Sequence, residues 1–410
     1  MKFVADFHIH SRYSRATSRD MCVPELSRWA KLKGITLLGT GDITHHLWTQ
    51  ELKTNLVAVG KTGLFLYDGV YFILTGEISS IYSQNNKVYR VHNLIMLPSF
   101  ELAAEVNRML ATYGNIASDG RPILGLSCLK LAEELFKISR DIMLVPAHVW
   151  TPWFSVFGSN SGFDTLEECF GKYTANITAL ETGLSSDPAM NWRLSKLDKF
   201  ALISNSDSHS PSRIGREANV FDCGLDYWEI KKVLETKDKE KFLYTIEFFP
   251  EEGKYHYDGH RACGQRLDPG ETKQHKGLCP ACGKPVTRGV MYRVQELADR
   301  PKDFVPENAI PYKSLVPLDE IIAASRGMSK SSKAVMADYE ETVRQFGSEF
   351  NIMVEASLDS LFAKMPSRLA EGIKRVREGR IKILAGYDGE YGIIDIFGAE
   401  EKQSEQLTLF

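Results

Sequence analysis

Short apolar runs alternate with amphipathic stretches over the first 249 residues of the chain. The apolar runs are bounded by polar residues and are predicted to be buried strands, at 3–7, 36–39, 70–74, 93–96, 142–145 and 201–203. Helical periodicity lies between several of them, at 24–33, 99–113, 127–138 and 187–197. This alternation predicts an α/β fold with a mostly parallel sheet. Polar residues stand at the strand ends, where parallel barrels carry their sites, and we therefore favour a barrel.

The pattern changes after Phe249. Residues 250–300 are rich in Gly, Lys, Arg and His, and are too polar to form a core by themselves. Helical periodicity returns at 318–322, 334–346 and 358–377, and a strand-like run at 393–397 precedes a charged tail. These changes predict four parts, namely a barrel at 1–249, a polar segment at 250–300, a small mainly helical domain at 301–397 and a flexible tail at 398–410.

Composition narrows the class of protein. Of the 410 residues 43% are hydrophobic and 25% are charged, which excludes a disordered or fibrous chain. Polar residues follow the first residues too early for a signal peptide, and no apolar run of about 18 residues appears, so we expect a cytoplasmic protein without a membrane partner. A net charge of -3 means that any contact with nucleic acid must come from local patches. The odd count of 7 cysteines argues against a disulfide framework.

Histidines and acids stand where the predicted strands begin or end. The His-Ile-His motif at 8–10 closes the first strand, and residues two apart in a strand point to the same side, so both imidazoles can reach one cation. The Asp-Ser-His motif at 207–209 repeats this spacing after another strand. The candidate metal ligands are His8, His10, Asp42, Glu77, His92, His148, Asp207 and His209. Eight ligands are more than one ion can bind. We therefore expect two or three divalent cations (Zn, Mn, Fe or Mg), a layout suited to phosphoryl transfer.

This set of motifs resembles the polymerase and histidinol phosphatase (PHP) family. The resemblance implies a distorted seven-stranded (β/α) barrel with a phosphoesterase centre of two or three metals. Two departures stand out. Arg15 occupies a position where many members carry a carboxylate, and Ile43 follows Asp42 where a His is usual, with His45 as a possible substitute.

The polar segment carries a second candidate metal site. Two half-sites, each with two intervening residues, are separated by fifteen residues and suit a tetrahedral structural zinc. Their members are His260, Cys263, Cys279 and Cys282. His256 or His275 could replace His260. A redox role for the Cys-x-x-Cys pair fits poorly, because no βαβ pattern surrounds it.

The order of these parts, together with the Gly-Tyr-Asp-Gly-Glu-Tyr-Gly motif at 386–392, resembles the endonuclease Q family. That family cuts DNA on the 5′ side of deaminated bases, such as uracil and hypoxanthine, and of abasic sites. The resemblance implies a DNA repair endonuclease whose metals activate a hydroxide, with Asp207 bridging cations or managing a proton and Arg15 holding the phosphate. The alternatives are a small-molecule phosphomonoesterase of the histidinol phosphatase type, which needs only the barrel, and a non-catalytic binding module.

Candidate contacts with damaged DNA lie in two places. Residues 364–382 carry an excess of basic side chains that could follow phosphates, among them Lys374, Arg375 and Arg377, although a solvated helical face explains them nearly as well. Trp150 and Trp153 lie in an aromatic loop that could stack on a base, or could simply pack as a lid.

The end of the chain suggests a protein partner. Its last five residues resemble the peptide that binds the bacterial DNA sliding clamp, through Gln406, Leu407, Leu409 and Phe410. This predicts a nucleoid-associated protein tethered to the clamp.

Overall fold

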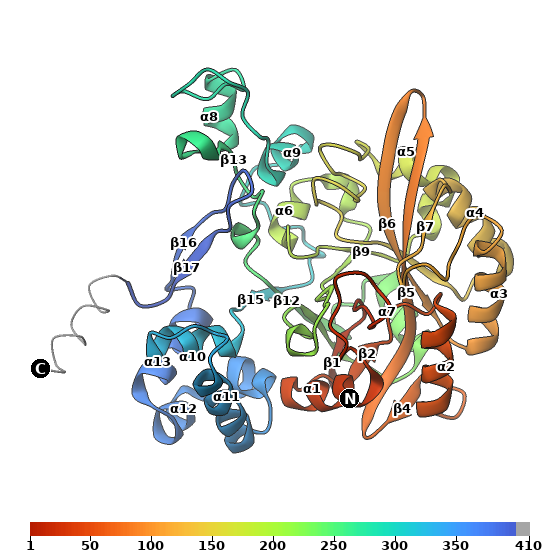
Figure 1. The fold of residues 1–410 in the computed structure, drawn as a ribbon, viewed down its shortest axis with the longest axis horizontal. Helices are drawn as coiled ribbons and strands as arrows, with labels where there is room; N and C mark the ends of the chain where they lie inside the picture. The colour runs from red at the N-terminus through yellow and green to blue at the C-terminus, as the bar shows by residue number, and fades with distance from the viewer. Residues whose placement is uncertain (399–410) are drawn as a thin grey trace, which may run out of the picture.

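The structure is a computed structural model that describes residues 1–398. Figure 1 shows an α/β part built around a central sheet, with the polar segment and a group of helices beside it. The described helices of the α/β part are α1 (Val23–Lys33), α2 (His46–Asn55), α3 (Phe100–Leu110), α4 (Cys128–Ile138), α5 (Leu166–Phe170), α6 (Pro188–Trp192) and α7 (Tyr227–Thr236). The later helices are α8 (Pro269–Gln274), α9 (Val290–Leu297), α10 (Leu318–Arg326), α11 (Lys333–Phe346), α12 (Leu358–Lys364) and α13 (Ser367–Arg377).

The central sheet is mixed rather than mostly parallel, which corrects the expectation from the strand–helix alternation. In one direction β1 (Lys2–Asp6) pairs in parallel with β2 (Leu37–Gly39), and β2 pairs in parallel with β5 (Val70–Gln84). In the other direction the path continues through antiparallel β11 (Ala218–Asp222) and β12 (Phe242–Glu247) to parallel β15 (Tyr312–Ser314).

A further antiparallel pairing is a long hairpin that the apolar runs did not reveal. Strand β5 extends well beyond the predicted run at 70–74 and turns back as β6 (Lys87–Leu97), forming the long ribbon that rises from the sheet in Figure 1. Asn85 and Asn86 form the turn with φ of 51° and 61°, the left-handed backbone that two-residue hairpins require. Glu77 and His92 consequently lie within strands, not at strand ends.

The remaining strands of the α/β part continue from this hairpin. Strand β8 (Met143–Pro146) pairs with β6, and β9 (Ala179–Glu181) pairs in parallel with β10 (Ala201–Ile203). The short strands β4 (Phe65–Tyr67) and β7 (Ile123–Leu124) pair with β5, and β3 (Val57–Ala58) pairs with β4. The count of seven strands and a closed barrel stay predictions.

Periodicity located the longer helices well. The ranges 24–33, 99–113 and 127–138 correspond to α1, α3 and α4, whereas 187–197 forms only the short α6 and a 3₁₀ turn at Ser195–Leu197. The range 358–377 divides into α12 and α13, since Pro366 cannot continue a helix. Within residues 1–398 no helix combines the length and apolar character needed to cross a membrane.

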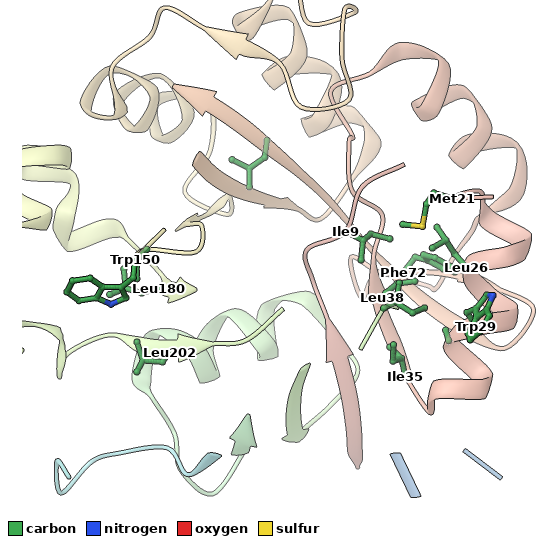
Figure 2. Packing of buried hydrophobic residues seen from close by; sticks show 14 of the residues in the cluster. Ile9, Met21, Leu26, Trp29, Ile35, Leu38, Phe72, Trp150, Leu180 and Leu202 are labelled. Carbon is green, nitrogen blue, oxygen red and sulfur yellow. The ribbon is translucent and has the colours of Figure 1, made fainter. Parts of the chain in front are cut away.

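Apolar side chains pack on both sides of the strands that carry the candidate ligands. Figure 2 shows Ile9 and Phe72 packed with residues of α1, and Trp150 lying near Leu180 and Leu202. Ile9 is 1% exposed, as expected for the residue between the two histidines of the first motif. Because Ile9 faces the core, the side chains of its neighbours His8 and His10 point to the opposite side.

The polar segment is joined to the end of the chain. Strand β13 (Asp258–His260) pairs with β14 (Gln265–Leu267), and β16 (Lys382–Leu384) pairs with β17 (Ile393–Asp395). The backbone N–H of Tyr257 donates to Gly386 O at 3.0 Å, and that of Gly259 donates to Thr287 O at 3.0 Å. The loop between β16 and β17 therefore lies against the polar segment.

Candidate metal centre

The first and last motifs of residues 1–249, the region predicted to form a barrel and called the barrel below, meet as their spacing predicts. Ile9 forms a parallel bridge with Ser208, and the N–H of His10 donates to Ser208 O at 2.9 Å. This contact places the His-Ile-His motif after β1 beside the Asp-Ser-His motif after β10. Two segments about 200 residues apart in the chain thus contribute to one site.

Six of the eight predicted ligands form two groups that share one carboxylate. In each group the candidate ligand atoms lie within 4.8 Å of one another; the groups are His8, His10, Glu77 and Asp207, and Glu77, His92 and His148. Glu77 Oε1 lies 2.6 Å from His92 Nδ1, whereas Glu77 Oε2 lies 3.3 Å from His10 Nε2. The two oxygens of Glu77 therefore face different groups, as in a bridging carboxylate.

The donor set fits divalent cations. His8 Nε2 is buried without a hydrogen-bond partner, and it lies 3.6 Å from Glu77 Oε2 and 3.8 Å from Asp207 Oδ1. An unpartnered ring nitrogen costs free energy in a protein interior unless it binds something. Imidazole together with carboxylate suits transition metals, and the number and identity of the ions stay predictions.

Asp42 lies behind His10 and not among the grouped ligands, which corrects its predicted role. Its Oδ1 lies 3.0 Å from His10 Nδ1, and its Oδ2 accepts from Ser11 N at 2.6 Å, from Ser11 Oγ at 2.6 Å and from Ser14 Oγ at 2.9 Å. Both oxygens are occupied by protein donors. A carboxylate in this position fixes the tautomer and orientation of a ligating histidine.

Glu181 plays the matching role behind His8 and was missed from the sequence. Both of its oxygens lie 3.0 Å from His8 Nδ1, and it also accepts from Asn205 Nδ2 at 2.8 Å and from the N–H of His148 at 2.8 Å. Glu181 ends the apolar strand β9, so the same strand-end pattern that singled out the other ligands could have found it. Each histidine of the first motif thus has its own orienting carboxylate.

His209 and His45 lie beside the groups. The His209 ring lies 4.5 Å from that of His10, and its Nδ1 lies 2.9 Å from Asp207 O. The His45 ring stacks on Tyr13 at 4.6 Å, directly before α2. Among residues 1–398 neither histidine belongs to a group of ligand atoms within 4.8 Å.

Backbone strain is concentrated at the centre. Asp42, His148 and Asp207 have φ of 47°, 30° and 46°, a region that residues with a side chain rarely adopt. Gly183 leaves room for one of them, because a Cβ there would lie 2.4 Å from His148 Cβ. Such strain persists where the surrounding structure holds functional side chains in place.

In the candidate metal centre, neighbouring charges shift the pKa values of the buried groups in the direction opposite to that caused by burial. Burial alone would lower the pKa of His8, but the negative charges of Glu181, Glu77 and Asp207 raise it well above its usual value. Burial would likewise raise the pKa of Glu77, but His92, Arg121 and His8 lower it well below. Glu77 therefore stays ionised and able to bind cations.

A cavity of about 420 Å³ opens over the two groups. Its lining includes His92, His148 and Asp207 from the centre, and Arg15, Arg121 and Trp153 from the loops above. Arg121 was not predicted, and its Nη1 lies 3.0 Å from Glu77 Oε2. The cavity thus combines candidate metal ligands with cationic side chains.

The two tryptophans of the aromatic loop have different surroundings. Trp153 is 37% exposed, and its ring lies 5.4 Å from that of Tyr255 in the polar segment. Trp150 is 1% exposed and donates from Nε1 to Asn191 Oδ1 at 2.8 Å. Trp150 is therefore a packing residue, which corrects its expected contact with a base, and Trp153 alone of the two is available to a ligand.

The predicted zinc ligands come together in the polar segment. Their candidate ligand atoms lie within 4.8 Å of one another, in the group His260, Cys263, Cys279 and Cys282. Gly264 and Gly283 follow two of the cysteines with φ of 63° and 71°, which lets the chain turn tightly around an ion. Burial would raise the pKa of Cys279, but backbone N–H groups at 281 and 282 lower it to about 7, which favours the thiolate that binds metal.

The alternative histidines lie outside the zinc group. His256 is 5% exposed, and His275 is the exposed residue that follows α8. Among the described residues only His260 is grouped with the three cysteines. A mixed set of three thiols and one imidazole is typical of structural zinc sites.

The basic residues of α13 are tied into the protein. Arg377 donates from Nε to Met353 O at 2.9 Å, from Nη1 to Ala356 O at 2.7 Å, and from Nη2 to Ile352 O. Arg375 pairs with Glu371 at 2.8 Å. Arg377 therefore stabilises the preceding turn, which corrects its expected role in DNA binding, and Lys374 remains a partly exposed candidate.

The predicted clamp-binding residues lie outside the described part of the chain. They are Gln406, Leu407, Leu409 and Phe410.

Comparisons with known proteins assign the chain to a family. Residues 317–380 match the family model described as the MJ0043 C-terminal domain. The chain is 34% identical over 269 residues to the uncharacterized protein MJ0043 of Methanocaldococcus jannaschii, a match that covers 63% of this chain and 33% of that protein. The chain thus spans about a third of the length of this relative. It is also 28% identical to the uncharacterized protein YqxK of Bacillus subtilis, over 96% of this chain and 99% of that protein.

Two solved structures extend the likeness over nearly the whole fold. The lesion-specific endonuclease PfuEndoQ from Pyrococcus furiosus superposes with a TM-score of 0.87 at 34% identity, over 98% of this chain and 99% of that chain. Endonuclease Q in complex with a 27-mer duplex carrying an abasic lesion superposes with a TM-score of 0.86 at 34% identity, over 98% of both chains. This identity over this coverage shows that the chain belongs to the endonuclease Q family.

Proposed function

We propose that this protein is a metal-dependent DNA repair endonuclease that hydrolyses the phosphodiester on the 5′ side of deaminated bases and abasic sites. The observation that carries the proposal is the pair of ligand groups sharing Glu77 at the floor of a cavity of about 420 Å³. A solved relative is described as lesion-specific, and another was solved with an abasic lesion at its active site. Both cover nearly the whole of this chain.

Divalent ions in the two groups would polarise the phosphate and activate the attacking water. The protein prepares the centre for this chemistry. Asp42 and Glu181 orient His10 and His8, and Glu77 spans both groups. Asp207 lies 3.1 Å from His10 Nε2 at the boundary between the ligands and the cavity, where a carboxylate can bridge cations or accept a proton from water.

Selectivity for damage follows from the cost of exposing a base. A deaminated base pairs less well than a normal one, so its extrusion from the duplex costs less free energy. Trp153 stands exposed at the rim of the cavity beside the polar segment, where it can stack on an extruded base or on its neighbour. Uracil, hypoxanthine and abasic sites are therefore the proposed lesions.

A cleavage assay tests the proposal. Duplexes with one uracil, one hypoxanthine, one abasic site or no lesion are incubated with the metal-loaded protein and resolved on a denaturing gel. We expect one cut 5′ to each lesion, no cut in the undamaged duplex, and no cut by Asp207→Asn or in the presence of a chelator. Equal cutting of all four duplexes would remove the lesion claim. Phosphate release from a free monoester without any nicking would instead favour the phosphomonoesterase.

The clamp interaction is a further part of the proposal and depends on the sequence of the tail. We propose that Gln406, Leu407, Leu409 and Phe410 bind the DNA sliding clamp, since a short terminal peptide can order on binding to a hydrophobic cleft. Deletion of 406–410 should abolish binding to immobilised clamp while leaving the cutting of short duplexes unchanged. Retention of full-length affinity by the deleted chain would contradict it.

A further inference from the structure

The positively charged side chain of Arg121 lies among the candidate ligands of the metal ions. Its Nη1 lies 3.0 Å from Glu77 Oε2, the oxygen that faces His8, His10 and Asp207. The side chain remains 28% exposed and lines the cavity. Within residues 1–398 its guanidinium donates a hydrogen bond to Glu77 alone, which leaves other N–H groups available for a ligand.

The charge of the loaded centre needs such a ligand. The carboxylates within or directly behind the two groups are Glu77, Asp207, Asp42 and Glu181. If each of the two groups holds one divalent ion, the four carboxylates balance the two ions, and Arg121 adds one positive charge. A guanidinium next to bound cations is repelled, and it is retained at low cost only where an anion joins the site. A phosphodiester carries one negative charge and matches this excess.

The loop that carries Arg121 is fixed by close packing. Gly120 has no room for a side chain, because a Cβ would lie 2.2 Å from Asp42 Oδ2 and 2.4 Å from Ser14 Oγ. The backbone N–H of Arg121 donates to Asp119 Oδ1 at 3.0 Å. The position of Arg121 is thus set by the same Asp42 that orients His10, so the guanidinium is preorganised relative to the metal ligands.

Asp119 connects this arginine to the rim of the cavity. Its second oxygen, Oδ2, lies 3.2 Å from Arg15 Nε, and the Arg15 side chain is 78% exposed. One carboxylate therefore positions two arginines at different depths. Arg121 lies at the ligands, whereas Arg15 lies where a neighbouring part of a DNA backbone would pass.

We propose that Arg121 is a catalytic residue that binds a non-bridging oxygen of the scissile phosphate, with Asp119 as its positioning residue; the proposal rests on the proposed function. In the reaction the oxygen of water bonds to phosphorus, the bond from phosphorus to the 3′ oxygen breaks, and a proton of the water ends on that oxygen. The products are a 3′ hydroxyl and a 5′ phosphate. Negative charge grows on the non-bridging oxygens as the water attacks, and a guanidinium placed there stabilises the transition state more than the bound substrate.

The depth of the two arginines predicts different kinetic effects. Arg121→Met should lower the single-turnover rate on a lesion duplex by about 10² to 10³-fold, the usual effect of removing one such donor, with little change in DNA affinity. Arg121→Lys should restore part of the rate, because it keeps the charge but not the planar fork. Arg15→Met should weaken DNA affinity several-fold and change the rate little.

The experiment compares a duplex with a normal scissile phosphate and one with a neutral methylphosphonate at that position. Arg121→Met should cost much less on the neutral substrate than on the normal one, a dependence that a merely structural role would not produce. Metal content, measured by inductively coupled plasma mass spectrometry, should equal that of the wild type. Arg108→Met is the matched control, since Arg108 is exposed on α3 away from the cavity, and it should behave as the wild type on both substrates.

Four results would overturn the proposal. A wild-type cutting rate for Arg121→Met would remove the residue from catalysis while leaving the proposed function intact. Loss of metal from that variant, or an equal cost on both substrates, would make Arg121 a structural counter-ion of Glu77. Failure of the wild type to cut any lesion duplex would end the proposed function, and this inference with it.

Discussion

The barrel centre and the zinc group are two candidate metal sites built in opposite ways. The ligands of the barrel centre run from His8 to Asp207, and those of the zinc group from His260 to Cys282. His8, His10 and Glu77 are fully or almost fully buried, whereas Cys282 is exposed and His260 and Cys263 are partly exposed. The first site has carboxylates behind its histidines, and its backbone is strained.

This difference in burial indicates whether each region needs its metal in order to fold. Strands β1, β5, β6, β9 and β10 are held by apolar packing, which can bring the distant candidate ligands together without help from an ion. The polar segment has few buried apolar residues, so metal binding must supply much of its folding free energy. We therefore expect the loss of metal to abolish catalysis in the barrel while it stays folded, and to unfold the polar segment.

The largest expected effect is on catalysis in the barrel. Asp207→Asn removes a grouped ligand at the edge of the cavity, and cutting of a uracil-containing duplex should fall by about 10³-fold or more, since metal and proton chemistry are both affected. The thermal midpoint should remain close to that of the wild type, because apolar packing holds the strands. Asp303→Asn, at an exposed residue of the same type, is the control. A collapsed midpoint for Asp207→Asn would show that the metal also builds the barrel.

The second effect is on folding and concerns the zinc group. Cys279→Ser removes a buried thiolate ligand, and residues 250–300 should become sensitive to limited proteolysis while the barrel stays resistant. Structural zinc contributes about 10 kcal/mol or more in small zinc-binding peptides, far more than this segment can gain from apolar burial. Zinc content should fall by one ion per chain.

Cys22→Ser is the control for this experiment, since Cys22 is partly exposed and lies outside the group. An unchanged proteolysis pattern for Cys279→Ser would mean that contacts such as Tyr257 N to Gly386 O hold the segment without metal.

The sequence predicted the zinc group more completely than the barrel centre. Both zinc half-sites are local, and the spacing alone pointed to the four residues that the structure groups, with His256 and His275 as open alternatives to His260. In the α/β part the strand-end pattern pointed to the residues that the structure groups, although Glu77 and His92 lie within longer strands than the apolar runs indicated. The long helices α1, α3 and α4 were also predictable, since their apolar periodicity is strong.

The remaining features depend on contacts that no local pattern encodes. Asp42 looks like a ligand in the sequence, and only the turn that brings Ser11 and Ser14 to its oxygens makes it an orienting group. Trp150 belongs to an aromatic run, yet the chain turns its ring toward Asn191. Arg121 has no motif at all, and its place at Glu77 follows from packing at Gly120. Long-range packing therefore decides which polar residues reach the cavity.

The third expected effect concerns how strongly the residues behind the ligands raise the metal affinity of the barrel centre. Glu181→Gln keeps the shape of the side chain but removes the charge behind His8, and metal affinity of the centre should weaken by about 10 to 100-fold, the usual cost of losing such a partner. Asp42→Asn should act in the same direction through His10. Competition with a fluorescent chelator measures both. The affinity of the zinc group should stay unchanged in each variant, and a parallel loss there would argue that the substitutions disturb the whole fold.

The smallest expected effect concerns a carboxyl group that the barrel buries without a metal. Glu247 ends β12 and is 0% exposed; its Oε2 accepts from Thr182 Oγ1 at 3.0 Å and from Ser204 Oγ at 3.1 Å. Burial raises its pKa from 4.5 to about 8, only partly offset by these hydroxyls, and the pKa of neighbouring Glu217 is also raised.

The folded barrel therefore holds a proton that the unfolded chain releases between pH 4.5 and about pH 8. The contribution of Glu247 to stability is complete below pH 4.5 and is lost as the pH rises through that window. Urea unfolding of the wild type should give a lower free energy of unfolding at pH 8 than at pH 5, because the folded state must then give up this proton or keep it at a cost. Glu247→Gln, neutral at both pH values, should reduce this difference, whereas Glu235→Gln on α7, at an exposed residue, should leave it unchanged. An unaltered difference in Glu247→Gln would mean that the folded protein does not hold this proton, and that its interior also tolerates a buried charge away from the metal ligands.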